Sequence, residues 1–240
     1  MRKLSVATLF FILALTAWTQ QAQAPVEITS EPHHHQVVEN NFVRAFAFSV
    51  DPGKSTLMHK HDHDYVSVFI GDSSGTNQKE GGQPAPVSFK DGDVKFAAAG
   101  VVHAVANTGS TPIRNATIEL LKPTTNAKAC TESCAVEIPC EAKDKASCPS
   151  VVKAFGSDQW QVTIVTLPPG STYPEHTHVG GVVTVALTDS SVIMRSKSRA
   201  RDIHSKVGDI QWHEPETHVV INNGKTTAKI AVLEFLHAGG

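Results

Sequence analysis

The sequence has almost no excess of charge of either sign, because 21 Lys and Arg residues face 23 Asp and Glu residues in a chain of 240. A domain that binds nucleic acid needs a basic face, so this balance argues against DNA or RNA as a partner. It also argues against attachment to a membrane surface through a polybasic patch. A Gly-rich phosphate loop, a G-x-S-x-G elbow and an H-E-x-x-H pair are missing, which argues against the enzymes that depend on them.

Long apolar runs are missing too, except for one at the N-terminus. Leu4–Trp18 is uncharged and mostly apolar, follows two basic residues and precedes the small-x-small sequence Ala22-Gln23-Ala24. This order is typical of a secretory signal peptide, so we predict one over residues 1–24, with cleavage before Pro25. An uncleaved membrane anchor is the alternative, but the run is shorter than the ~20 residues that a spanning helix needs. We therefore expect a secreted or periplasmic protein without membrane contact after cleavage.

Cysteine is scarce, and its four copies are confined to one short segment. In an exported protein an even number of cysteines favours two disulfides. A four-thiolate zinc site is the alternative, although the spacing is irregular for paired zinc knuckles. The sequence does not choose among the three possible pairings of Cys130, Cys134, Cys140 and Cys148. Residues 128–149 have no counterpart elsewhere in the chain, so we predict a Cys-rich linker that is stapled to itself.

The most informative feature that is present is an internal duplication. The segment Gly53–His61, with its glycine and two histidines, recurs 117 positions later as Gly170–His178. A third histidine, His103, recurs 115 positions later as His218, so two single-residue deletions account for the drift. Each copy exceeds the roughly 20–50 residues of a solenoid repeat, so the copies are two domains rather than units of an array.

Within each copy the sequence pattern is that of β-strands. Residues 43–50 and 160–167 are rich in β-branched and aromatic side chains, and both runs stop at Pro and Gly. Many short strands separated by turn signals are typical of a sandwich or barrel, and no long amphipathic helix is visible. We therefore predict an all-β protein with one barrel over residues 25–127 and a second over 150–240.

Six of the thirteen histidines are placed where they can hold metal ions. Two histidines that are two positions apart on a strand point to the same face, and the third comes from a later strand. Imidazole suits Fe, Mn, Zn, Ni or Cu, and three protein ligands leave coordination positions open for catalysis. The two predicted metal sites are His59, His61 and His103 in the first copy, and His176, His178 and His218 in the second.

These motifs resemble those of the cupin superfamily. Gly53–His61 and Gly170–His178 match the opening of its first motif, and Gly92–Asn107 matches its second, except that Ala98 replaces a proline. Gly208–Asn222 fits the second motif with one deletion. The resemblance covers nearly all of the chain outside the signal peptide and the Cys-rich segment. It implies two tandem double-stranded β-helix (jelly-roll-like) barrels, a bicupin, with a divalent metal inside; such barrels often pair through edge strands, so a homodimer is possible.

The glutamate that usually completes the metal site in this family is missing. Counting forward from His61 places Tyr65 there, whereas counting back from the next glycine places Asp64 there. Tyr65 shares strand parity with the histidines and so would face inward, as in some cupin lyases where a tyrosine acts near the metal. Asp64 would need a local bulge to turn inward. In the second copy Gly181 aligns with Asp64 and offers no ligand, so a three-histidine site is expected there.

Two further features lie near the predicted sites. Glu119 recurs 115 positions later as Glu234, at the same spacing as the third histidines, and both glutamates interrupt apolar strand patterns. Pointing inward, such a carboxylate would orient a histidine or serve as a general base; we expect instead an outward, solvated position. We expect His33–His35 to belong to a flexible polar arm. The run Trp212–Glu214, close to the second site, suggests a lining for its mouth.

Three hypotheses for function follow. The first is a metal-dependent enzyme that acts on a small organic molecule, as a dioxygenase-type oxidoreductase or as an isomerase or lyase, with Tyr65 or Glu119 transferring protons. The second is a non-catalytic module that binds a small ligand or metal, because fold alone does not decide function. In the third, only the first barrel is active, since its second motif is the better preserved.

Overall fold

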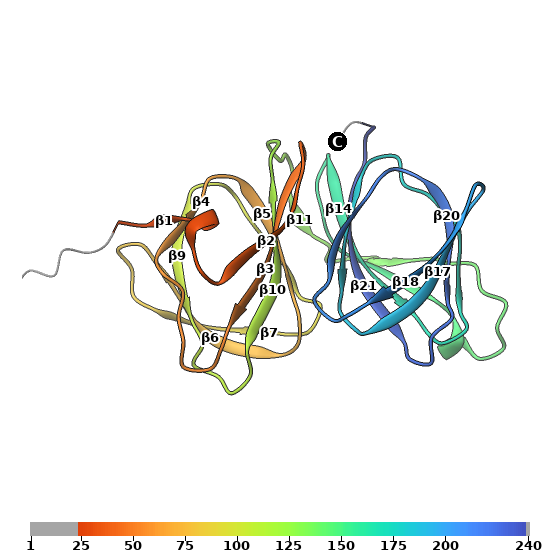
Figure 1. The fold of residues 1–240 in the computed structure, drawn as a ribbon, viewed down its shortest axis with the longest axis horizontal. Coiled ribbons are helices and arrows are strands. Elements are labelled where there is room, and N and C mark those ends of the chain that lie inside the picture. The colour runs from red at the N-terminus through yellow and green to blue at the C-terminus, as the bar shows by residue number, and fades with distance from the viewer. Residues whose placement is uncertain (1–23, 239–240) are drawn as a thin grey trace, which may run out of the picture.

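The computed structural model describes residues 24–238, so the predicted signal peptide lies almost wholly outside the described residues. The chain forms two β-barrels that lie side by side, the first in red to green and the second in teal to blue (Figure 1). The predicted all-β fold with two tandem barrels is confirmed. Within the described part, no helix is long and apolar enough to cross a membrane.

The first barrel consists of two five-stranded sheets that face each other. One has the strand order β1-β4-β9-β6-β7 and the other β2-β3-β10-β5-β8. A short 3-10 helix, η1 (Ile28–Ser30), follows the first strand. The strands are β1 (Val26–Glu27), β2 (His34–Glu39), β3 (Val43–Val50), β4 (His59–His61), β5 (Asp64–Phe69), β6 (Ser73–Lys79), β7 (Ala85–Phe89), β8 (Val94–Ala97), β9 (Val101–Ala106) and β10 (Ile113–Leu120).

The second barrel repeats this plan. Its larger sheet has the order β11-β13-β14-β21-β16-β19, with β12 also paired to β13, and its smaller sheet has the order β15-β20-β17-β18. The 3-10 helix η2 spans Lys145–Ser147. The strands are β11 (Lys128–Ala129), β12 (Ala135–Val136), β13 (Ser150–Gly156), β14 (Trp160–Leu167), β15 (Thr172–Thr177), β16 (Val182–Ala186), β17 (Ser190–Ser196), β18 (Ala200–Ser205), β19 (Ile210–His213), β20 (Thr217–Asn222) and β21 (Ala228–Phe235).

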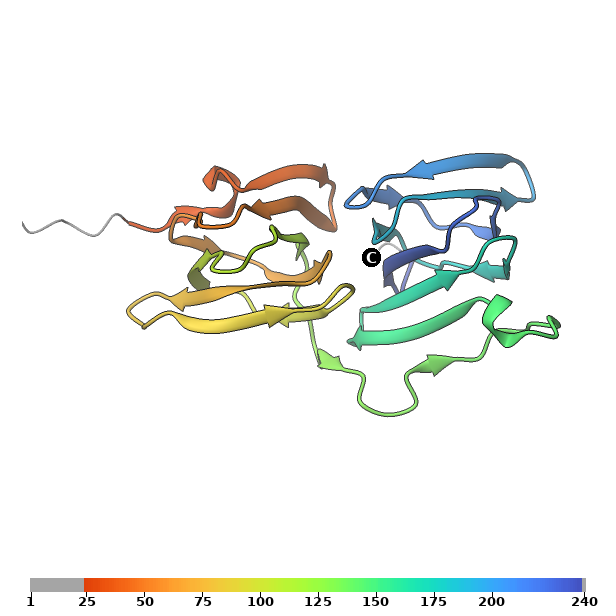
Figure 2. The same cartoon turned by 90° about the horizontal axis from the view of Figure 1, so that it is seen from below.

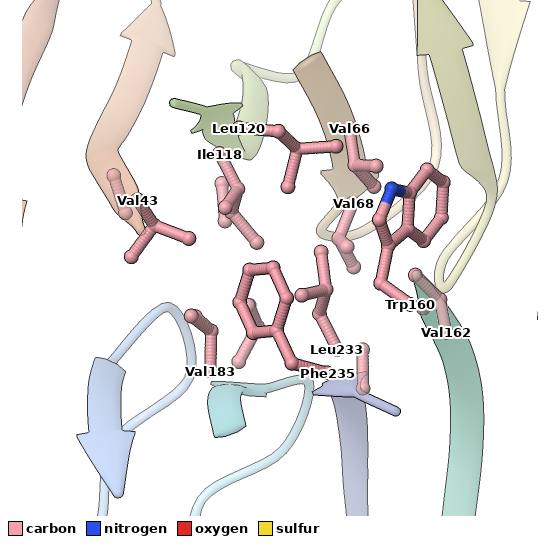
Figure 3. Packing of buried hydrophobic residues seen from close by; sticks show 14 of the residues in the cluster. Val43, Val66, Val68, Ile118, Leu120, Trp160, Val162, Val183, Leu233 and Phe235 are labelled. Atoms are coloured by element: carbon pink, nitrogen blue, oxygen red, sulfur yellow. The ribbon is translucent and has the colours of Figure 1, made fainter. Parts of the chain in front are cut away.

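The two barrels share one hydrophobic core. Ile118 and Leu120 on β10 point out of the first barrel and pack with Leu233 and Phe235 from β21 of the second (Figure 3). Trp160 on β14 lies in the same cluster and is 1% exposed. Both faces of β10 and β21 are therefore covered, one by the barrel interior and one by the neighbouring barrel.

The Cys-rich segment contains the two predicted disulfides, Cys130–Cys134 and Cys140–Cys148. The prediction of a segment stapled only to itself was incomplete, because β11 and β12 within it pair with β13. Figure 2 shows the segment running along the lower edge of the second barrel. It thereby extends the larger sheet of that barrel, since an edge strand offers unpaired backbone groups to any adjacent extended chain.

Candidate metal centres

The first histidine triad lies inside the first barrel. His59 and His61 occupy β4, and His103 on β9 stands directly opposite His59 in the antiparallel register. The side-chain nitrogens that the three residues offer lie within 4.8 Å of one another. The Nε2 atoms of His61 and His103 are 3.2 Å apart. The structure thus brings together the three histidines that the sequence predicted for this site.

Two of these imidazoles are held by their Nδ1 atoms. His59 Nδ1 donates to the carbonyl oxygen of Leu57 at 2.9 Å, and His103 Nδ1 donates to Asn77 Oδ1 at 2.9 Å. Because each acceptor is an oxygen without a proton, the proton lies on Nδ1 and the lone pair lies on Nε2. The Nε2 atom of His59 is buried and has no hydrogen-bond partner among residues 24–238. A buried polar atom of this kind is costly unless something occupies the centre.

Burial keeps two of these imidazoles neutral, those of His59 and His103. It lowers the pKa of His59 to about 4, and together with the neighbouring histidines it lowers the pKa of His103 to about 3. Neutral imidazole is the form that binds a metal ion, so at neutral pH His59 and His103 present lone pairs rather than charges.

Glu119 lies behind His61, and the expectation that it points outward was wrong. It is fully buried, and its Oε2 atom pairs with Arg44 Nη2 at 2.8 Å. Its Oε1 atom lies 3.8 Å from His61 Nδ1. Burial alone would raise the pKa of Glu119, but His61 and Arg44 hold it below its ordinary value. Glu119 is also not among the residues that line the barrel cavity.

Tyr65 and Asp64, the two candidates for a fourth ligand, lie in different places. Tyr65 faces inward as its strand parity predicts, and its ring stacks on His61 with 4.0 Å between centroids. Burial raises its pKa to about 12. The Asp64 carboxylate instead accepts backbone N–H groups from Ala99 at 2.8 Å and Thr124 at 3.0 Å. Asp64 therefore ties two loops together and does not belong to the histidine cluster.

His34 is a feature of this site that sequence reasoning missed. The expected polar arm is an ordered strand, because His34–Glu39 forms β2 and pairs with β3. His34 is 8% exposed, its ring centroid is 4.9 Å from that of His59, and its Nδ1 atom donates to Glu31 Oε2 at 2.8 Å. Glu31 is 1% exposed and also accepts the backbone N–H groups of His33 and Leu57. In the sequence, the available signal for this pair was the spacing of three positions between Glu31 and His34.

A cavity of about 300 Å³ opens beside the first triad. Aromatic rings form part of its wall, and four polar side chains from β5, β6 and β10 form another part. Thr117 Oγ1 donates to Asn115 Oδ1 at 2.7 Å within this wall. The lining includes His34, Phe48, Tyr65, Ser67, Phe69, Asn77, Phe89, Asn115 and Thr117.

The second triad repeats the first. His176 and His178 come from β15 and the turn after it, and His218 on β20 pairs with His176 as His103 pairs with His59. The offered nitrogens again lie within 4.8 Å of one another. His176 Nδ1 donates to the Pro174 carbonyl at 2.8 Å. Burial, with the charges of the neighbouring histidines, lowers the pKa of His218 to about 3.

Glu234 also points inward, against the expectation, but its contacts differ from those of Glu119. Its Oε1 atom accepts from His178 Nδ1 at 2.9 Å, and its Oε2 atom accepts from Gln161 Nε2 at 3.1 Å. Gln161 stands opposite Glu234 in the strand register, as Arg44 stands opposite Glu119. The second carboxylate is therefore directed to its histidine, whereas the first is shared with a guanidinium.

The run Trp212–Glu214 divides between two roles. Trp212 stacks on Phe42 of the first barrel, with 5.9 Å between centroids, so it belongs to the shared core rather than to a cavity mouth. His213 lines the second cavity, and its Nε2 atom lies 3.0 Å from Thr184 Oγ1. This cavity has a volume of about 170 Å³.

Comparison with known proteins identifies the fold. No family model and no curated protein matches the sequence. Among solved structures, AerE from Microcystis aeruginosa has a TM-score of 0.57 at 10% identity, over 86% of this chain and 99% of that one. The Lactobacillus farciminis oxalate decarboxylase formate complex has a TM-score of 0.55 at 12% identity, over 85% and 84%. A cupin 2 conserved barrel domain protein from Leptotrichia buccalis has a TM-score of 0.51 at 9% identity, over 84% and 88%.

Proposed function

We propose that this chain, whose fold is that of a two-barrel cupin, is a metal-dependent enzyme that converts a small polar organic molecule in its first barrel. His59, His61 and His103 would hold the catalytic metal, and His176, His178 and His218 would hold a second ion. The observation that carries the proposal is the convergence of three imidazoles on one point beside a cavity.

The donor set fits a divalent transition metal. The Nδ1 hydrogen bonds of His59 and His103 aim the Nε2 lone pairs inward, and the buried Nε2 of His59 has no partner among the described residues. A hydrogen bond made by the other ring nitrogen orients a ligand histidine in metal sites. Iron, manganese, zinc, nickel and copper all suit imidazole ligands. A Bacillus subtilis oxalate decarboxylase with Mn(II) centres has a TM-score of 0.55 and 12% identity to this chain, which makes manganese one metal to test.

A bound ion would supply Lewis acidity, or redox chemistry if it is iron, manganese or copper. The chain's own groups would bind the substrate and handle protons. Tyr65, held protonated by burial, can donate a hydrogen bond to a substrate oxygen. His34 holds its Nδ1 proton against Glu31 and leaves Nε2 without a partner in the described part of the chain, so it can accept a proton from substrate.

Glu119 has a different role in this proposal. It does not line the cavity, so we assign it to orienting His61 rather than to proton transfer. Tyr65 remains a candidate for proton transfer, and His34 takes the place of Glu119 in that pair.

A dioxygenase-type reaction is our first choice of chemistry. Three protein ligands leave room for a substrate and for dioxygen at the same centre. Redox-neutral lyase or isomerase chemistry is the second candidate, and the two proton-carrying groups in the cavity, Tyr65 and His34, support it. The non-catalytic binding module is the remaining alternative.

The test begins with the metal content of the purified protein, followed by oxygen uptake with phenolic and diketone substrates. We expect oxygen consumption that is lost in His59→Ala/His61→Ala and retained in the matched variant His176→Ala/His178→Ala. Product formation without oxygen uptake would replace the dioxygenase by a lyase or isomerase. Stoichiometric metal with ligand-dependent thermal shifts but no turnover would leave only the binding module.

Export and assembly stay predictions. The two disulfides are consistent with an oxidising compartment and so support the predicted export. Light scattering of the purified protein tests whether it forms the homodimer that the family resemblance suggests.

A further inference from the structure

We propose that the second cavity is a binding site for a small aliphatic molecule with one oxygen-containing head group, a ligand class different from that of the first cavity. The head group would face the second triad, and the aliphatic part would pack against the inner wall. The contact of the head group rests on the proposed metal site, whereas the aliphatic pocket does not.

The argument comes from the internal repeat, because equivalent positions of the two barrels can be compared one by one. His34 stands opposite Phe48 in the register, and Val151 stands opposite the equivalent Val165. Five polar or ionisable side chains of the first cavity have apolar counterparts in the second, and all ten line their cavities. The pairs are His34 and Val151, Tyr65 and Val182, Asn77 and Met194, Asn115 and Ile230, and Thr117 and Val232.

Two other lining positions change from apolar to polar, Ala97 to His213 and Phe89 to Ser205. The five replacements named above all act in the opposite direction. Each removes a hydrogen-bond donor or acceptor, and a polar substrate would then lose its partners and bind poorly. The aromatic Phe69 of the first cavity is replaced by Ala186 in the second, which leaves space beside the new aliphatic groups. The second cavity therefore favours a CH₂ chain over a polar body.

The apolar wall is continuous with the histidine triad. Val220 follows His218 by two positions on β20 and so lies on the same face of the strand. Val220 belongs to a buried cluster with Val151 and Val192. Val136, from the disulfide-bonded segment, completes the lining. One cavity thus joins a polar end, which includes the imidazoles and Glu234, to an aliphatic end.

The test uses the zinc-loaded full-length protein and isothermal titration with acetate, butyrate and hexanoate, alongside ethanol, butanol and hexanol. Burial of each CH₂ is worth up to about a fourfold gain in affinity, so hexanoate should bind up to about 15-fold more tightly than butyrate. We expect the alcohols to show the same chain-length trend. The acids should bind more tightly than the alcohols if a metal holds the head group.

Matched variants exchange the two walls. Ile230→Asn/Val232→Thr copies the first cavity and should abolish the chain-length trend, whereas Asn115→Ile/Thr117→Val should leave it in place. Ala186→Phe, which copies Phe69, fills the cavity without adding a polar atom and serves if the double variant does not fold. Thermal unfolding checks the fold of each variant.

The outcomes separate this inference from the proposed function. Equal affinities for butyrate and hexanoate, or a trend that survives both second-cavity variants, overturn the aliphatic site. A chain-length trend in protein that binds no zinc supports the aliphatic site while it refutes the proposed metal centre of the second barrel.

Discussion

Replacing Glu234 by Gln should weaken metal binding at the second centre much more than replacing Glu119 by Gln weakens it at the first. Glu234 accepts directly from His178 Nδ1 at 2.9 Å, and its other partner, Gln161, is neutral. A carboxylate that accepts from a ligand histidine raises the basicity of that ligand, and its loss costs about 10–100-fold in metal affinity. This corresponds to about 1.4–2.7 kcal/mol.

The first centre should respond less because its carboxylate is shared with a guanidinium and lies farther from its histidine. Glu119 lies 3.8 Å from His61 Nδ1 and pairs at 2.8 Å with Arg44, whose side chain is 21% exposed. The Glu119→Gln change should therefore lower metal affinity less than about 10-fold. It should instead lower the free energy of unfolding by about 1.5–3 kcal/mol, the worth of a hydrogen bond to a charged group.

The assay is a zinc competition with a chromophoric chelator, with the other centre emptied by the His59→Ala/His61→Ala or His176→Ala/His178→Ala change. Urea unfolding of the same variants gives the stability. Equal losses of affinity in the two Gln variants, or a loss below about threefold in Glu234→Gln, would refute the reasoning from hydrogen-bond geometry.

Three further predictions concern the whole protein. The pKa of His59 is lowered to about 4 in the fold, so the unfolded state binds more protons than the folded state between pH 6.5 and pH 4. The contribution of ~3 kcal/mol that His59 makes to the free energy of unfolding is therefore complete above pH 6.5 and is lost as the pH falls through that window. Acid titration of metal-free protein, followed by circular dichroism, checks this, and unchanged stability down to pH 4 would contradict it. Phe235→Ala should lower the free energy of unfolding by about 3–5 kcal/mol and lower the unfolding temperature of both barrels together, since Phe235 lies in their shared core. Calorimetry checks this, and two separate transitions, of which only the one of the second barrel shifts, would argue for independent barrels. Asn107→Ala should lower the free energy of unfolding by about 1–3 kcal/mol without changing the metal affinity, because the buried amide of Asn107 donates to the carbonyl groups of Val50 and Thr111. Chemical denaturation and zinc titration measure the two effects, and Asn222→Ala is the matched variant in the second barrel.

Local spacing made the histidine triads predictable. Residues two apart on a strand share a face, so His59 and His61 had to point the same way. The 115-residue displacement of His103 to His218 then placed a third histidine in register with each pair. The inward position of Tyr65 followed from the same parity.

Contacts between distant segments made other features unpredictable. Glu31 and His34 lie against the first triad only because β2 pairs with β3. The position of Asp64 depends on two backbone N–H groups, those of Ala99 and Thr124, which come from loops far along the chain.

The sequence by itself determined the internal duplication, the all-β fold and the segment that holds the two disulfides. It also determined which six histidines belong to the two triads. Only the tertiary structure decided which face of β10 and β21 looks into a barrel. Their apolar residues, such as Ile118 and Leu233, pack against the neighbouring barrel, so the alternate residues turn inward. Glu119 and Glu234 therefore lie beside the histidines rather than in solvent, because a strand buried on both faces has no outward side for its polar residues.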